Sequence, residues 1–262
     1  MSNGPGTSRP GLTALVVARN EEARLGPCLE SLKFADEIVV VLDRCTDGSK
    51  KIAEKFADRV VVGAWEREGD RRNAGIAAAA GPWVIEVDAD ERVPDALARE
   101  ARQVAENGAY DIHDVPVDNY IGGRLVRHGW MAAIGTTAAP RLFRKGTKVW
   151  GNQRVHPHLH VSGRQGPRLE NALVHETARN ISDLLLRLDR NTTWRAGDLR
   201  ETGETGSFAD AVRKIFSRFW KCYVLRRGYR ENGLGFVIAL CAALYPVLSH
   251  LKARLEAAER NP

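Results

Sequence analysis

The sequence predicts an α/β fold with a mainly parallel sheet flanked by helices. Over the first third of the 262 residues, apolar runs of strand length alternate four times with stretches of helical periodicity. This alternation is typical of parallel strands joined by right-handed helical crossovers. Polar residues directly follow these apolar runs, and open α/β sheets bind ligands at the carboxyl ends of their strands. We therefore expect a binding site at that edge.

The expected elements follow one another with short connections. The first strand is a continuous apolar run of the kind that parallel sheets bury, and the later strands repeat the pattern. In chain order we expect a strand at 12–18, a helix through Leu25, Leu29 and Leu32, a strand at 37–42, a helix at 50–56, a strand at 59–62, an Ala-rich helix up to Gly81 and a strand that ends at Asp88.

Two carboxylates, Asp88 and Asp90, close this last strand with one residue between them. Carboxylates two residues apart at a strand end can both reach one hard divalent cation, such as Mg²⁺ or Mn²⁺, and such a cation neutralises a diphosphate. A second interpretation is purely structural, because acidic residues favour the N-terminus of the helix that Pro94 begins.

Four segments resemble the family 2 glycosyltransferases of GT-A fold: Val17-Ala-Arg-Asn-Glu-Glu, residues 37–49, Arg72-Asn-Ala-Gly and Val87-Asp-Ala-Asp-Glu. They occur in the family's order within residues 12–95. Further along, Arg141-Leu-Phe-Arg-Lys-Gly, the region of His175 and residues 227–236 resemble the branch of lipopolysaccharide-core beta-glucosyltransferases. The resemblance implies a metal-dependent hexosyltransferase with a nucleotide-sugar donor and a hydroxyl acceptor.

The resemblance also implies roles for individual residues. Asp88, Asp90 and His175 would hold Mn²⁺ or Mg²⁺, and Asp88 would also contact the nucleotide sugar. The other donor-binding candidates are Asn20, Glu21, Asp43 and Arg72. Each has a structural alternative: helix capping or an Asx turn for the first three, a solvated arginine for Arg72, and a hydrogen-bonded histidine for His175. The chain departs from the family at Leu42, since the usual aspartate comes one residue later as Asp43.

The catalytic base is less clearly indicated. An inverting transferase needs a carboxylate or a histidine to take the proton of the acceptor hydroxyl. The related branch carries Val-His-Glu, whereas this chain has Val155-His156-Pro157. Three readings stay open: His156 or His158 serves as the base, Glu176 does so instead, or the activity has been lost. The last reading leaves a catalytically silent protein that binds a nucleotide sugar or a membrane.

The C-terminal third carries the positive charge. Residues 178–262 hold 15 Lys and Arg against 9 Asp and Glu, and residues 211–230 include seven basic residues and no acidic one. On a helix, an apolar arc of Val212, Ile215, Phe216, Phe219, Trp220 and Tyr223 would lie opposite Lys214, Ser217, Arg218 and Lys221. A basic amphipathic helix of this kind suits an anionic membrane surface. Its alternative is packing on the catalytic domain.

The uncharged segment 234–251 is at the lower limit for a helix that spans a membrane, and Pro246 argues for a monotopic foot instead. We therefore expect contact with an anionic membrane through residues 211–254, at the cytoplasmic face of the inner membrane. Nucleic acid is not expected as a partner, because the aromatic residues lie away from the basic ones and no nucleic-acid motif is present.

The expected organisation has three parts: a disordered leader at 1–11, a catalytic domain at 12–177 and a basic helical extension at 178–262. Within the catalytic domain, residues 12–95 would bind the nucleotide sugar and 96–177 the acceptor. The four cysteines show no CxxC spacing, which favours a reducing compartment. The predicted function is transfer of a sugar from a nucleoside diphosphate, UDP by resemblance, to a lipid-linked or lipopolysaccharide-type glycan, with inversion.

Overall fold

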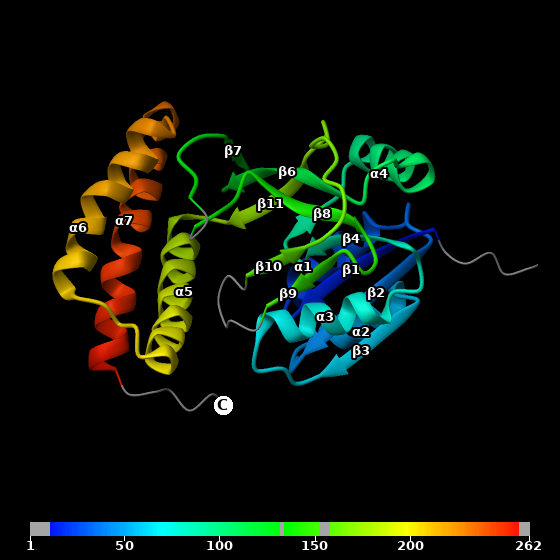
Figure 1. Ribbon diagram of the computed structural model, residues 1–262, viewed down its shortest axis with the longest axis horizontal. Coiled ribbons are helices and arrows are strands. Elements are labelled where there is room, and N and C mark those ends of the chain that lie inside the picture. The colour runs from blue at the N-terminus through cyan, green and yellow to red at the C-terminus, as the bar shows by residue number, and fades with distance from the viewer. Residues whose placement is uncertain (1–10, 132–133, 152–157, 257–262) are drawn as a thin grey trace, which may run out of the picture. The chain divides into compact units, whose positions relative to one another are not determined.

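The computed structural model describes residues 11–131, 134–151 and 158–256 (Figure 1). The chain divides into two compact units, which are described separately. The first comprises residues 1–116, 138–152 and 158–174, and the second comprises 117–137, 153–157 and 175–262.

The first unit begins with the predicted alternation of strands and helices, so the expected α/β class is confirmed. Its elements are β1 (Leu12–Ala18), α1 (Glu22–Glu30), β2 (Glu37–Asp43), α2 (Ser49–Phe56), β3 (Arg59–Gly63), α3 (Glu68–Ala78) and β4 (Trp83–Asp88). The pairs β1–β2, β1–β4 and β2–β3 are all parallel. Strand β2 is buried along its whole length, as its continuous apolar run predicted.

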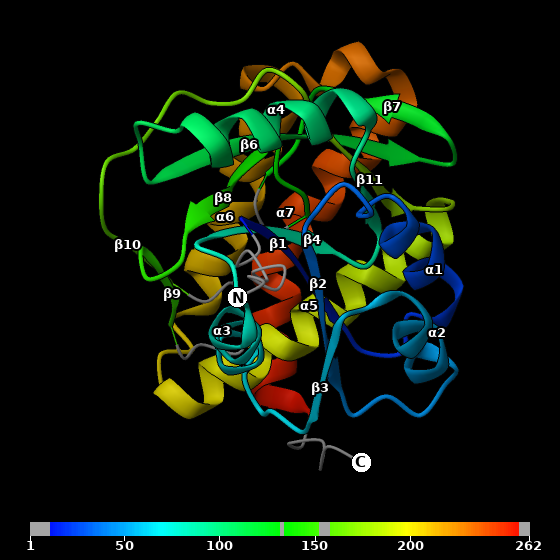
Figure 2. The ribbon, with the colours of Figure 1, turned by 90° about the vertical axis from the view of Figure 1, so that its right-hand side faces the viewer.

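The strand order β3-β2-β1-β4 reverses between β1 and β4. Right-handed crossovers therefore place α1 and α2 on one face of the sheet and α3 on the other, as Figure 2 shows. A reversal of this kind opens a crevice at the carboxyl ends of the two central strands, which is where open α/β sheets bind ligands. Val17 and Asp88 lie side by side in the register of β1 and β4, so Asp88 ends its strand at this crevice.

Antiparallel pairing extends the sheet beyond β4. The strand β8 (Ala138–Arg144) pairs with β4 and with β6 (Ile112–Ile121), and β6 continues from the first unit into the second. The remaining elements up to residue 178 are β5 (Glu91–Arg92), α4 (Asp95–Asn107), β7 (Arg124–Val126), β9 (Lys148–Trp150), β10 (Leu159–Val161) and β11 (Leu173–Ala178). The resulting mixed sheet has the order β3-β2-β1-β4-β8-β6-β11-β5, with β7 paired to β6.

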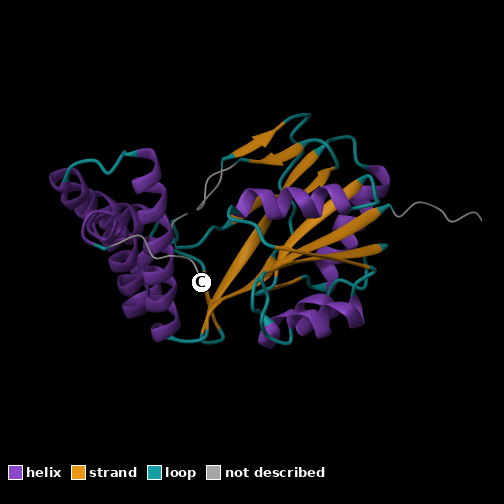
Figure 3. Cartoon of the chain, turned by 90° about the horizontal axis from the view of Figure 1, so that it is seen from below, coloured by secondary structure: helices purple, strands orange, loops and turns teal. Residues whose placement is uncertain are grey.

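The second unit is mainly helical, and Figure 3 shows its helices gathered in one group. They are α5 (Ile181–Thr202), α6 (Phe208–Trp220), the π-helix η1 (Lys221–Leu225), the 3₁₀-helix η2 (Gly228–Glu231) and α7 (Asn232–Leu255). Local sequence sets their ends. The side chains of Asn180 and Ser207 accept hydrogen bonds from the third residue of α5 and of α6, and Gly203 ends α5 in the left-handed conformation.

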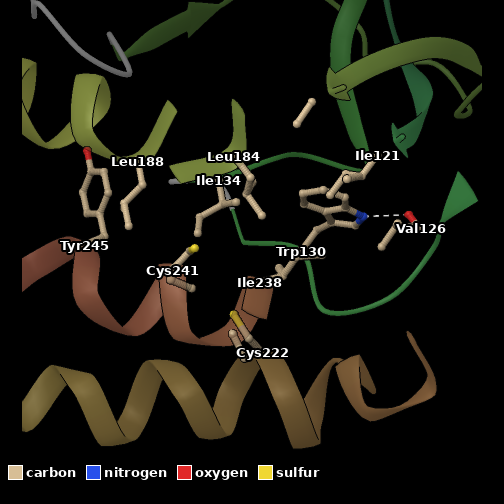
Figure 4. Close-up of a cluster of buried hydrophobic side chains, with 13 residues drawn as sticks. Ile121, Val126, Trp130, Ile134, Leu184, Leu188, Cys222, Ile238, Cys241 and Tyr245 are labelled. Atoms are coloured by element: carbon tan, nitrogen blue, oxygen red, sulfur yellow. Dashed lines mark hydrogen bonds between the residues drawn. The ribbon is translucent and has the colours of Figure 1, made fainter. Parts of the chain in front are cut away.

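The core of the second unit combines these helices with the segment 117–137. Trp130 and Ile134 pack among Leu184 of α5 and Ile238 and Cys241 of α7, and the indole of Trp130 donates a hydrogen bond to the carbonyl oxygen of Val126 (Figure 4). The chain from Gly228 to Leu255 is long and apolar enough to cross a membrane, but 56% of its most apolar window is buried in the protein. Its composition therefore reflects, at least in part, a role as a core helix.

Candidate active site

A compact turn follows the carboxyl end of β4, and an acidic residue just after the turn holds it in place. Ala89 and Asp90 form the turn, and Glu91 folds back so that its Oε2 accepts a hydrogen bond from the backbone N–H of Asp88 at 2.8 Å. Glu91 is buried, whereas the side chain of Asp88 is 29% exposed. The turn therefore leaves the carboxylate of Asp88 half-buried at the end of β4, and Glu91 holds the backbone of Asp88 in place.

Two guanidinium groups hold the carboxylate of Asp88. Arg72, on α3, donates to Oδ1 at 2.9 Å, and Arg141, on β8, donates to Oδ2 at 2.6 Å. Each arginine has a second acidic partner: Glu68 for Arg72 at 2.8 Å, and Glu91 for Arg141 at 3.0 Å. The result is a chain of alternating charges at the strand end. Arg72 is buried, so the alternative of a solvated surface arginine is wrong.

Burial alone would raise the pKa of Asp88, but the charges of Arg141 and Arg72 outweigh it and hold that pKa well below the usual value. The same contacts raise the pKa of Arg141 against the effect of its own burial. Asp88 is therefore ionised at neutral pH. The Nε of Arg141 is buried without a hydrogen-bond partner in the described protein, which is rare for a buried donor.

A second charged pair lies beneath the first. Glu86 stands two residues before Asp88, which places both side chains on one face of β4. Its Oε2 accepts a hydrogen bond from the Nζ of Lys148, and its Oε1 accepts one from the indole N–H of Trp150 at 2.9 Å. Both members of the ion pair are fully buried. Burial lowers the pKa of Lys148 to about 8, although Glu86 acts in the opposite direction.

Trp150 connects this buried pair to Arg72. The guanidinium of Arg72 lies over the indole ring at 5.0 Å from its centroid, a geometry suited to a cation–π interaction. The side-chain amide of Asn73 bonds both ways to the backbone of Trp150, donating to its carbonyl oxygen at 2.8 Å and accepting from its N–H at 2.9 Å. Asn73 and Trp150 thereby fix strand β9 against helix α3.

The residues predicted to bind the nucleotide lie at the ends of β1 and β2. Asn20 adopts a positive φ of 55°, and its Oδ1 accepts a hydrogen bond from the N–H of Thr46 at 2.8 Å. Asp43 is buried and accepts from the N–H of Trp65 at 3.0 Å and from Arg71 at 3.3 Å. The structure thus brings Asn20 and Asp43 to neighbouring strand ends. Glu21 lies next to Asn20, at the N-cap position of α1, without a side-chain capping bond.

The candidate catalytic bases are distributed over both units. His156 lies outside the described residues. His158 is exposed and precedes β10, which contains the exposed His160. Glu176 lies in β11 and is half-buried. Sequence alternation points its side chain to the face of β11 opposite that of His175. The choice of base among these residues stays a prediction.

His175 belongs to the second unit and is buried. Its Nδ1 lies 2.8 Å from the Oδ1 of Asn119 and 3.2 Å from the hydroxyl of Thr177. The same amide oxygen of Asn119 accepts a hydrogen bond from Thr177 at 3.0 Å. These bonds fit the structural alternative of a hydrogen-bonded histidine, and they also orient the ring. Its role as a metal ligand stays a prediction.

The residues predicted to bind the metal differ in how well their surroundings suit a cation. Within the described ranges, no three His, Cys, Asp or Glu side chains are grouped so as to hold a metal ion. Both oxygens of Asp88 face guanidinium groups, and two adjacent positive charges disfavour a cation there. Asp88 therefore does not fit as a ligand in this arrangement. Asp90, which is half-buried in the turn that follows β4, is the better candidate.

Sequence reasoning missed most of this charge cluster. Glu91, Glu86, Lys148 and Arg141 were not among the predicted site residues. Glu91 and Arg141 contact Asp88 directly, whereas Glu86 and Lys148 form the buried pair that Trp150 connects to Arg72. One signal was present: Glu86 interrupts the apolar run Trp83-Val-Ile-Glu-Val, and a charged residue inside a buried strand requires a buried partner. The run alone did not indicate where in the chain that partner lies.

A strand order that reverses between β1 and β4, with a charged cluster at the reversal, is the arrangement in which open α/β sheets bind their ligands. A family model described as glycosyl transferase family 2 matches residues 13–164. The chain therefore belongs to glycosyl transferase family 2.

Relatives along the whole chain agree with this assignment. The chain is 26% identical over 255 residues to the lipopolysaccharide core biosynthesis glycosyltransferase LpsC of Rhizobium meliloti, with 92% of this chain and 91% of LpsC covered. It is 23% identical over 273 residues to an uncharacterized glycosyltransferase of Rickettsia bellii, with 96% and 88% covered. The crystal structure of S. aureus TarS matches 85% of this chain and 45% of the TarS chain, with a TM-score of 0.50 and 16% identity. That likeness supports the fold.

Proposed function

We propose that this glycosyltransferase moves a sugar from a UDP-sugar to a hydroxyl group of a lipid-linked or lipopolysaccharide-type glycan, with inversion. The observation that carries the proposal is the cluster of Asp88, Arg72 and Arg141 at the carboxyl end of β4 in a family 2 fold. The acceptor class is supported by the likeness to LpsC over nearly the full length of both chains. The choice of UDP rests on the resemblance described in the sequence.

The two arginines suit a diphosphate. A guanidinium group binds phosphate and carboxylate oxygens with the same geometry, so Arg72 and Arg141 can exchange part of their bonding to Asp88 for bonds to the donor. Asp88, relieved of part of its pairing, would then contact the nucleotide sugar, as the resemblance implies.

We assign the divalent metal, Mn²⁺ or Mg²⁺, to Asp90 rather than to Asp88. A carboxylate in a partly exposed turn suits a hard cation that retains water ligands. When bound, the metal would stabilise the negative charge that develops on the departing nucleoside diphosphate. His175 is kept as a further candidate ligand. His156, His158 and Glu176 are kept as candidate bases for the acceptor hydroxyl.

The first experiment measures Mn²⁺-dependent release of UDP from a panel of UDP-sugars, with and without a lipid extract as acceptor. Wild type is compared with Asp90→Ala, His156→Ala and Glu176→Gln. We expect release that disappears in Asp90→Ala and falls in whichever base variant is correct. Release in wild type that persists undiminished in Asp90→Ala would overturn the metal assignment.

The competing function is a silent transferase-like protein, and Pro157 is the observation that favours it. This alternative predicts metal-dependent binding of UDP in calorimetry together with no release from any donor, even with acceptor extract. It also predicts that Arg141→Gln weakens UDP binding as much as in an active enzyme. The two functions therefore differ in turnover, not in binding.

A further inference from the structure

The second unit exposes large apolar side chains in two rows. On α6, Phe216 and Trp220 are 74% and 58% exposed. On α7, Phe236, Leu240 and Leu244 are each about 40% exposed and recur at intervals of four residues. Because this spacing places residues on one face of a helix, each set forms a continuous row. Soluble proteins rarely leave such contiguous apolar surface uncovered without an interaction that uses it.

The two rows meet at the seam between the helices. Helices α6 and α7 pack along each other, and the ring of Phe219 lies 5.6 Å from that of Phe236 across the seam. Tyr223 stacks on Phe219 at 5.4 Å and also contacts Phe236. Since Phe219 lies between Phe216 and Trp220 on its helix, the rows join into one surface. We call Phe216, Trp220, Phe236, Leu240 and Leu244 the apolar strip.

The arrangement corrects one detail of the predicted amphipathic helix. Arg218 was expected to face away from the apolar arc, but its guanidinium lies over the ring of the buried Tyr245 on α7, 5.6 Å from the centroid. Helix α6 therefore packs with Arg218 turned inward. Of the six residues of the predicted arc, Phe216 and Trp220 are the two left exposed.

Basic side chains flank the strip. Arg213, Lys214 and Lys221 are exposed on α6 and at the start of η1, and Arg226, Arg227 and Arg230 are exposed in the connection to α7. Arg213 pairs with the exposed Asp210 of its own helix at 3.1 Å, and Glu231, the next acidic residue along the chain, is buried and accepts hydrogen bonds from the backbone of Arg127 and His128. The surface around the strip is therefore positive.

We propose that the apolar strip and its basic flank dock onto an anionic phospholipid surface, with α6 lying in the headgroup layer. Aromatic side chains beside lysine and arginine are the composition that such a layer binds. A second copy of the chain fits less well, because a two-fold contact through this surface would bring like charges together. The biological reason for the docking rests on the proposed lipid-linked acceptor, but the docking itself is independent of turnover.

The test is flotation of the purified full-length protein with phosphatidylcholine vesicles, with and without phosphatidylglycerol. We expect binding to the anionic vesicles that weakens at high salt. Phe216→Gln with Trp220→Gln should reduce the partition coefficient by about tenfold or more, because two rings no longer enter the lipid. Lys214→Gln with Lys221→Gln should reduce it to a similar extent through charge alone.

The matched control is Leu186→Gln, which changes a residue of the same unit that is 66% exposed on α5. It should bind vesicles like wild type. All variants should keep the wild-type thermal transition and any release of UDP from the donor, so a failed docking proposal and a failed transferase proposal give different results. Equal binding to neutral vesicles, unchanged binding of the Phe216 and Trp220 variant, or a wild-type dimer that this variant dissociates would each overturn the proposal.

Discussion

The guanidinium of Arg141 lies 2.6 Å from the carboxylate of Asp88, although the two residues are 53 positions apart in the sequence. Strand β8 carries Arg141 and pairs antiparallel with β4, which ends in Asp88. The contact therefore joins the antiparallel extension of the sheet to its parallel half at the point where the site forms. Arg141 also binds the buried Glu91, so one side chain neutralises two carboxylates.

Replacing Arg141 by Gln should destabilise the protein by about 3–5 kcal/mol, because Glu91 would remain buried without a compensating charge. Denaturant unfolding followed by circular dichroism measures the change. The matched control is Arg59→Gln, which removes an exposed arginine 3.9 Å from Glu37 and should change stability by about 1 kcal/mol or less. Equal losses of stability in the two variants would show that the contacts of Arg141 with Asp88 and Glu91 add little to the free energy of unfolding.

The buried Lys148 makes the free energy of unfolding depend on pH in the alkaline range. Its pKa of about 8 in the folded protein lies below the ordinary value of 10.5. Between these two values the unfolded chain binds more protons than the folded one, so the contribution of Lys148 to the free energy of unfolding rises with pH. The stability of wild type relative to Lys148→Met should therefore increase by up to about 3 kcal/mol from pH 8 to pH 10.5. A stability difference between wild type and Lys148→Met that stays constant across this pH range would contradict the lowered pKa. The control is Lys145→Met, which replaces an exposed lysine.

Asp88 gives a dependence of the same sign, but at acid pH. Arg141 and Arg72 lower its pKa well below 3.8 despite its burial, so the ionised form stabilises the folded state fully above the unfolded pKa. This contribution is lost as the pH falls below 3.8 toward the folded pKa. Asp88→Asn should cost about 1–3 kcal/mol at pH 7. The gap between wild type and variant should narrow in acid unfolding experiments, and a gap that stays constant down to pH 2 would argue against the ion pairs.

Gly69 and Gly233 both lie in the first turn of a helix and should respond in opposite ways to alanine. A Cβ at Gly69 would lie 1.8 Å from the carbonyl oxygen of Gly151, whereas one at Gly233 would meet nothing within 4 Å. We expect Gly69→Ala to destabilise the protein by about 1–3 kcal/mol through a forced backbone shift. Gly233→Ala should stabilise it by about 0.5–1 kcal/mol. Thermal denaturation of both variants checks the prediction, which fails if their melting temperatures move in the same direction.

Local sequence was enough to predict the parallel half of the sheet. The apolar runs at 12–18, 37–42 and before Asp88 are long, continuous and separated by helical periodicity, so strand burial and crossover direction follow from elementary rules. The same runs place Asp43 and Asp88 at strand ends, where the structure has them.

The charge cluster could not be predicted in the same way. Lys148 reaches Glu86 only because β8 pairs antiparallel with β4 and the chain then returns through β9, and no local pattern determines that pairing. The opposite error occurred at Arg218: a helical wheel ranks residues by polarity, but tertiary packing turned this arginine toward Tyr245. Long polar side chains can bury their apolar stems, so polarity alone does not predict their direction.

Trp130 and Ile134, which come from residues 117–137, share one core with helices that begin only at Ile181. A chimaera that exchanges the C-terminal helices between two relatives must therefore carry this earlier segment along. A shortened protein that stops after β11 would lack the helices that bury Trp130. The apolar surface left exposed would favour aggregation. A substitution that changes the volume of a side chain in one stretch is therefore felt by the other, although about forty residues of the chain separate them.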